Sequence, residues 1–262
     1  MKKYLYIIKT TFNDSIQYAG SLIFKFFGFI ITMLILISLW NFIYSGGDGI
    51  IKGYTFNQMI WYLLLAEIIT FGSGSKVATD EVKNTIKSGN IAYQVNKPYH
   101  YIIYTICKYL ADTFIRFIAF ALIASIIGII FAGKIDISFI HIICIIPIFL
   151  IGVLINGLNR ILISLSSFWV EDSRPFQMAY GKIILIFGVF FPLEMFPGII
   201  QKIIRYSPIY GVATGPAKLV LDFNYQLFIE VLITQIIIIL IFSLLIKIIY
   251  DKGVKKLNVN GG

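Results

Sequence analysis

Charged and amide side chains inside long apolar runs are the residues of this sequence whose types could carry chemistry. Ionisable groups at such positions are candidates for a function, because burying a charge among apolar neighbours is costly. Glu67, Asp112 and Arg116 therefore support the hypothesis of an ion-coupled carrier or channel. The full set comprises Glu67, Asp112, Arg116, Asn156, Asn159 and Arg160, with Glu194 and Glu230 near what we expect to be the outer side.

Spacing favours a structural role for part of this set. Asp112 and Arg116 are four residues apart, so they share one face of a helix and can pair with each other. We interpret them as a structural ion pair. Arg160 forms a polar face with Asn156 and Asn159, which suits either a helix–helix contact or the wall of a cavity.

Catalytic patterns are missing from the sequence. It contains no paired carboxylates, no His–Glu set and no nucleophile elbow, and FGSGSKVATD (71–80) lacks the spacing of a phosphate-binding loop. His100 and His141 lie near the ends of apolar runs, where solvated histidines are common. Cys107 and Cys144 lie within such runs, which is typical of small core residues. We expect no catalytic, cofactor or metal site, although a membrane-embedded enzyme or an assembly scaffold stays as a third hypothesis.

Composition identifies the class of protein. Of the 262 residues, 58% are hydrophobic and 13% are charged, and the mean hydropathy is +0.87. Soluble domains have roughly 45–50% apolar and about 25% charged residues. One water-soluble core cannot hide this much apolar surface, so we predict an integral membrane protein whose spans are helices. The net charge of +9 is typical of lysine on the cytoplasmic face, not of nucleic-acid binding.

Six apolar runs reach the roughly 18 to 20 residues that a bilayer requires. They cover 22–44, 56–75, 99–131, 139–168, 179–196 and 226–250. The third and fourth are longer than needed and should tilt or project beyond the lipid. An all-α polytopic membrane protein with six transmembrane helices follows.

The N-terminal segment 1–20 is amphipathic. Its apolar residues Leu5, Ile8, Phe12 and Ile16 recur at helical spacing, which predicts a helix lying in the membrane interface. The alternative is a helix packed on a neighbouring protein helix.

Lysine and arginine distribution sets the orientation. With the N-terminus inside, the cytoplasmic side holds fifteen of these residues against five outside. Both termini are therefore predicted to face the cytoplasm. The five outer residues are Lys52, Lys134, Lys202, Arg205 and Lys218.

A charged insert of helix size, TDEVKNTIKSGNIAYQVNKP (79–98), follows the second run on the cytoplasmic side. Thr79 or Asp80 can cap a short helix and Gly89 can end it. We expect an exposed face with apolar residues among the charges, whereas the alternative is a plain charged loop. These apolar residues are Val82, Ile86, Ile91 and Tyr93.

Two further loops carry unusual residues. FWVEDSRPF (168–176) joins the fourth and fifth runs, and its charges form either a compact contact or a solvated turn. The segment 190–216 holds four of the seven prolines but stays apolar, which predicts short helical pieces that re-enter the outer leaflet. The alternative is a surface loop with an amphipathic helix.

The order of these elements resembles the permease subunit of a type-2 ABC exporter. The inner loop IKSGNIAYQVNKP (86–98) and the later part FWVEDSRPFQMAYGKIILIFGVFFPLEMFPGIIQKIIRYSPIYGVATGPAKLVL (168–221) resemble poorly characterised bacterial permeases of this class. The resemblance extends over essentially the whole chain, 1–262, as a single transmembrane permease domain.

That resemblance implies a mechanism with partner chains. Two permease halves, identical or paralogous, would bind two ATP-binding cassette ATPases, which carry the ATP and Mg, at a bacterial plasma membrane. The loop 76–98 would hold the coupling helix, and the segment 190–220 would line the outer exit. The residues implied for coupling are Asp80, Glu81, Val82, Lys83, Ile86, Lys87, Gly89, Ile91 and Tyr93. Those implied for the outer gate are Pro192, Glu194, Pro197, Pro208, Tyr210 and Pro216.

Overall fold

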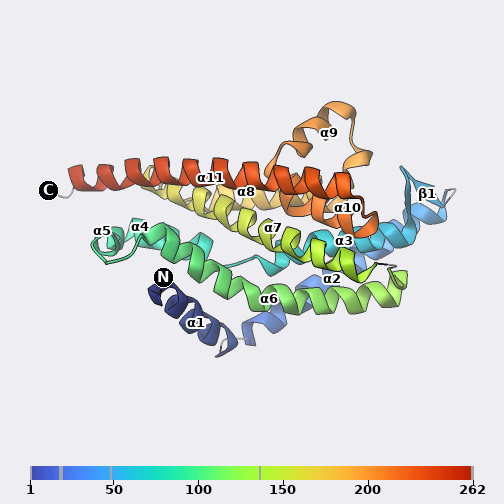
Figure 1. Cartoon of the computed structure of the whole chain (residues 1–262), viewed down its shortest axis with the longest axis horizontal. Coiled ribbons are helices and arrows are strands. Elements are labelled where there is room, and N and C mark those ends of the chain that lie inside the picture. Colours follow the sequence, from blue (N-terminus) through green and yellow to red (C-terminus); the bar gives the residue numbers. More distant parts are fainter. Residues whose placement is uncertain (1, 18–19, 48, 136, 261–262) are drawn as a thin grey trace.

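The computed structural model describes residues 2–17, 20–47, 49–135 and 137–260, which are mostly helical. Long helices run side by side, and short helices collect at the two ends of the bundle (Figure 1). In chain order the elements are α1 (Lys2–Gln17), α2 (Gly20–Ser45), β1 (Ile50–Ile51), β2 (Tyr54–Thr55), α3 (Phe56–Gly72), the π-helix η1 (Val77–Glu81), α4 (Val82–Lys87), α5 (Asn90–Val95), α6 (Tyr101–Ala132), α7 (Phe139–Leu165), the 3-10 turn η2 (Ser166–Phe168), α8 (Arg174–Ile184), the π-helix η3 (Leu185–Phe190), the 3-10 turn η4 (Leu193–Met195), α9 (Gly198–Arg205), the π-helix η5 (Tyr210–Thr214), α10 (Gly215–Leu221) and α11 (Tyr225–Asn260).

Four helices of the described chain, α2, α6, α7 and α11, are long and apolar enough to cross a bilayer. The 32 residues of α6 reach about 48 Å, so α6 exceeds the roughly 30 Å hydrocarbon core as predicted. The second expected span is the shorter apolar helix α3 of 17 residues. All-α architecture is therefore confirmed, with four spans of full length among the six expected.

The fifth expected span, 179–196, is displaced in the structure. The helix begins at Arg174, where Pro175 occupies the first turn, and it continues through η3 to Phe190. Phe191 is extended, with φ −131° and ψ 128°, because it precedes Pro192. Both predicted ends were wrong, since hydropathy alone registers neither the proline that starts this helix nor the one that stops it.

Aromatic and glycine residues pack the helices closely. The rings of Phe29 in α2 and Phe71 in α3 pack edge to face, with their centres 5.3 Å apart. Phe120 of α6 packs against both rings. A Cβ at Gly157 of α7 would overlap the ring of Tyr109 of α6. Small residues at such crossings let membrane helices approach closely.

The two ends of the bundle differ. The insert helices α4 and α5, α1 and the end of α11 lie at one end, whereas the β1–β2 hairpin and α9 lie at the other (Figure 1). Lys52 and Gly53 form the hairpin turn with φ values of 51° and 89°. Positive φ at both turn residues matches the twist of a tight hairpin. This hairpin is absent from the sequence-based prediction.

Helix α1 packs against α6, so the alternative of a helix packed on a neighbour is realised within the chain. Thr11 and Ser15 face α6, while Leu5 and Ile8 of the predicted apolar face stay exposed at 63% and 36%. Ile16 lies outside the residues whose side chains the structure describes. The exposed apolar residues leave α1 a face that suits a membrane interface.

Candidate functional site

The charged insert folds as two short helices, η1–α4 and α5. The first begins at Val77, before the expected caps Thr79 and Asp80, and no side chain caps it. It ends as predicted, because Gly89 has φ +74° and its N–H donates to the carbonyl of Ile86 at 3.1 Å. The sequence IAYQV, expected only to follow the helix, forms α5.

The prediction that the apolar residues of the insert are exposed is largely wrong. Val82, Ile86 and Ile91 are buried at 0%, 4% and 0% exposure, and only Tyr93 stays open at 68%. Helix α4 packs against α7 and η2, and α5 contacts α11. The three aliphatic side chains therefore hold the insert against its own chain, because burying them removes apolar area from water.

Ion pairs also attach the insert. Glu81 pairs with Lys108 of α6 at 2.6 Å, and Lys83 pairs with Asp172 at 3.5 Å. The Arg174 backbone N–H and guanidinium hold the pKa of Asp172 below its usual value. The 168–176 loop thus forms the compact charged contact, and its partner is the insert.

Two charged residues of the insert, Asp80 and Lys87, take no part in these attachments. Across the residues that the structure describes, no ion pair or side-chain hydrogen bond joins Asp80 or Lys87 to the chain. Lys87 and Tyr93 lie on the exposed face of the insert, and Asp80 is half-buried beside it. A polar face with one large aromatic is the composition of many protein contacts.

Backbone contacts fix the base of the insert. The hydroxyl of Ser164, in α7, donates to the carbonyls of Ala78 at 2.8 Å and Thr79 at 3.1 Å. Gln177 of α8 donates to the same hydroxyl at 3.0 Å. Sequence reasoning missed Ser164 and Gln177, because a lone serine or glutamine in an apolar helix shows no pattern.

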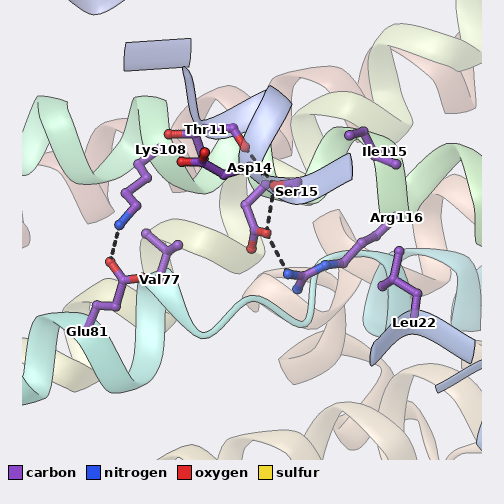
Figure 2. Close-up of a pocket in the computed structure, with 10 residues that line it drawn as sticks. Thr11, Asp14, Ser15, Leu22, Val77, Glu81, Lys108, Ile115 and Arg116 are labelled. Carbon is purple, nitrogen blue, oxygen red and sulfur yellow. Dashed lines mark hydrogen bonds and ion pairs between the residues drawn. The ribbon is translucent and has the colours of Figure 1, made fainter. Parts of the chain in front are cut away.

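A polar junction beneath the insert joins three segments (Figure 2). Asp112 accepts hydrogen bonds from Ser75 at 2.5 Å and Ser15 at 3.2 Å, and it pairs with Arg116 at 2.5 Å. Arg116 also donates to the carbonyl of Gly74 at 2.7 Å. The structural ion pair predicted from the i, i+4 spacing is confirmed, but the two serines were not foreseen.

This junction borders a cleft of about 250 Å³ between α1, η1 and α6, in which Lys108 reaches Glu81 beside it (Figure 2). A buried ion pair contributes to stability only when further hydrogen bonds satisfy both partners. Here Ser15 of α1 and the 73–76 turn supply these hydrogen bonds to the pair, which α6 carries. The pair therefore ties these three segments together.

The predicted polar face of α7 contacts α8. Asn156 is buried and accepts from the hydroxyl of Tyr180 at 2.9 Å, while Arg160 lies 5.5 Å from the centre of the same ring. Asn156 also donates to Ser73. Glu67 is buried at 1% exposure, with one carboxylate oxygen bonded to Thr70. Arg160 and Glu67 both border a second cleft, so the face serves as a helix contact and a cavity wall together.

The proline-rich segment 190–216 consists of short helical pieces, as its prolines predict. Glu194 binds Lys218 and accepts from Tyr54 at 2.9 Å, which links η4, α10 and the hairpin. Helix α9 projects from the bundle (Figure 1), whereas η5 and α10 pack against α3 and α7. Of the predicted gate residues, Pro192, Tyr210 and Pro216 are buried, Pro208 is half-buried and Pro197 is exposed.

The described part of the chain contains no group of three His, Cys, Asp or Glu side chains that could hold a metal ion. Cys107 and Cys144 are unpaired and half-buried. The polar residues are instead arranged around helix contacts and two clefts.

Comparison with known protein families identifies the family of this chain. Residues 19–261 match the family described as ABC-2 family transporter protein. The chain belongs to the ABC-2 transporter family. No curated protein matches the sequence. As an ABC-2 permease the chain is a multi-pass membrane subunit of a transporter and not its catalytic subunit, and membership implies partnership with ATP-binding cassette ATPases.

Proposed function

We propose that the chain is the transmembrane subunit of an ATP-driven exporter and that the insert 77–95 is its contact with the ATPase. ATP and Mg would bind to that partner, and a second permease subunit, identical or paralogous, would complete the path. The observation that carries the proposal is a short helical insert buried on one side and polar on the other.

The attachments of the insert suit transmission of movement. The chain fixes it to α6 through Glu81, to α7 through Ser164 and to the α7–α8 loop through Lys83. Pressure on its exposed face would thus move these helices together. A loosely tethered loop would instead absorb such a displacement.

Helix α1 supports the same end of the molecule. The hydroxyl of Tyr4 accepts from the backbone N–H of His100 at 3.2 Å, and Lys3 donates to the carbonyl of Pro98. The N-terminal helix would therefore brace the loop that follows the insert while its exposed Leu5 and Ile8 lie in the membrane interface.

The proposed orientation places both termini and the insert in the cytoplasm of a bacterial cell, with re-entrant helices η5 and α10 on the outer side. The lysine distribution supports it, and so does the gathering of α1, the insert and the end of α11 at one end (Figure 1).

A double variant tests the docking face. We expect Lys87→Glu with Tyr93→Ala to weaken ATPase association by about tenfold or more, because exposed aromatic anchors dominate protein contacts. The measurement is the ratio of Walker-motif ATPase to permease after purification. Lys202→Glu in α9, exposed at the opposite end, is the matched control and should leave the ratio unchanged.

Glu81 is unsuitable for this test, because reversing the charge at this residue would also break its ion pair with Lys108. An unchanged ratio in the Lys87 and Tyr93 variant would remove the insert from the contact.

The hypothesis of an ion-coupled carrier loses most of its support, because two of its three residues have partners within the chain. Asp112 and Arg116 are occupied with each other and with backbone or serine partners. Glu67 alone among the three keeps an unpaired buried oxygen within the described residues.

A further inference from the structure

The second cleft, of about 440 Å³, lies between α2, α3, α7 and α8 and has a charge pattern that the coupling function does not use. Its basic lining residues are Lys25, Arg160 and Lys182, and its one acidic residue is Glu67. Its volume is within the range of small-molecule sites, about 300–1,000 Å³.

The basic residues have no acidic partner in the described chain. Lys25 donates to the neutral carbonyl of Gly74 at 3.2 Å. Arg160 lies over the ring of Tyr180, and its Nε has no hydrogen-bond partner within the described ranges. Lys182 is exposed and forms no ion pair among the described residues. Three basic residues against one acidic residue around one cleft favour an anion there.

The charged groups share one level of the bundle. Lys25, Glu67 and Arg160 are each five residues from the end of their helix. At about 1.5 Å per residue, that distance is roughly 8 Å. These three helix ends are the ones beside the insert, because Lys25 reaches the turn that follows α3. The cleft therefore has its polar part near one membrane surface.

Apolar side chains form the rest of the cleft. Phe71, Met178, Ile184 and Leu185 line it, and Met178 is 68% exposed, so the cleft opens to the outside of the chain. An amphiphile in the lipid phase could enter from that side with its chain beside Ile184 and Leu185.

Glu67 requires that a ligand of this cleft also carry a hydrogen-bond donor. Its side chain is 1% exposed and lines the cleft, and its Oε1 has no hydrogen-bond partner among the residues that the structure describes. Buried polar atoms are almost always hydrogen-bonded, so a ligand that supplies a donor would satisfy it.

We propose that this cleft binds an amphiphile with an anionic headgroup that also carries a hydrogen-bond donor, such as a phosphate monoester. Lys25, Arg160 and Lys182 hold the anion, and Glu67 accepts from the donor. That this ligand is the exported substrate rests on the proposed function, whereas binding itself does not require the ATPase.

Equilibrium binding to the full chain in phosphatidylcholine nanodiscs tests the site, with empty nanodiscs subtracted. Fluorescent dodecyl phosphate is the probe, and dodecyltrimethylammonium is the matched cationic amphiphile. We expect the phosphate alone to bind saturably. Loss of a charge-assisted hydrogen bond in Arg160→Gln or Lys182→Gln should raise its Kd about tenfold.

Lys202→Gln, at the far end of the molecule, should leave the Kd unchanged. Because Lys182 is exposed, its variant stays informative if Arg160→Gln fails to fold. Equal affinity for the cationic amphiphile, or an unchanged Kd in both cleft variants, would overturn the proposal.

Nanodiscs that contain phosphatidylglycerol separate the two sources of the ligand. Competition by this lipid supports the site with a membrane lipid as its occupant, and undiminished probe binding supports it with a non-lipid amphiphile. Intact binding in a chain that associates with no ATPase would refute the exporter function but leave the site in place.

Discussion

Asp112→Ala is expected to lower the free energy of unfolding by about 3–5 kcal/mol, the loss typical of a buried pair with one partner removed. Arg116 would keep only the carbonyl of Gly74, and Ser75 would lose its acceptor, whereas Ser15 would keep the carbonyl of Thr11. The measurement is thermal unfolding of the purified chain in nanodiscs.

Two variants make this result specific. Asp14→Ala, at an exposed residue in the same cleft, should leave the unfolding temperature almost unchanged. Asp112→Ala combined with Arg116→Met should recover much of the loss, because it removes the unpaired charge. If Asp112→Ala unfolded like the unmodified chain, the junction would not tie α1, the 73–76 turn and α6 together.

Ile86→Asp is expected to abolish most ATPase association while the long spans stay folded. The side chain at this position is 4% exposed, and burying an unpaired carboxylate there costs several kcal/mol. Helix α4 would therefore leave its contact with α7, and the exposed face of the insert would lose its fixed position.

Ile86→Val provides the control, because it keeps the site apolar and costs only about 0.5–1.5 kcal/mol. Its ATPase-to-permease ratio should match the unmodified chain. Equal association in Ile86→Asp would mean that burial of the insert is irrelevant to the partner contact.

Hydropathy and spacing predicted the long helices well. The expected run 99–131 is α6 within two residues at its start and one at its end, and the i, i+4 spacing of Asp112 and Arg116 predicted their pair. These features depend on nearest neighbours along one helix, which a single sequence displays. The span 179–196 was displaced because Pro175 and Pro192, not apolarity, determine where that helix begins and ends.

Contacts between distant segments were not predictable in the same way. Val82, Ile86 and Ile91 among charges look alike whether they face a partner or their own chain, and only the packing of α4 on α7 decides. Ser164 and Gln177 acquire their roles from the backbone of the insert, far away in sequence.

The most direct test of the account is cross-linking from the exposed face of the insert. A photoreactive phenylalanine derivative in place of Tyr93 should cross-link, from the cytoplasmic side, to a chain that contains a Walker A peptide. The same group in place of Tyr206, exposed at the opposite end, should not. If residue 93 were instead labelled by a membrane-impermeant reagent from outside the cell and no ATPase peptide were recovered, the insert would not be the ATPase contact.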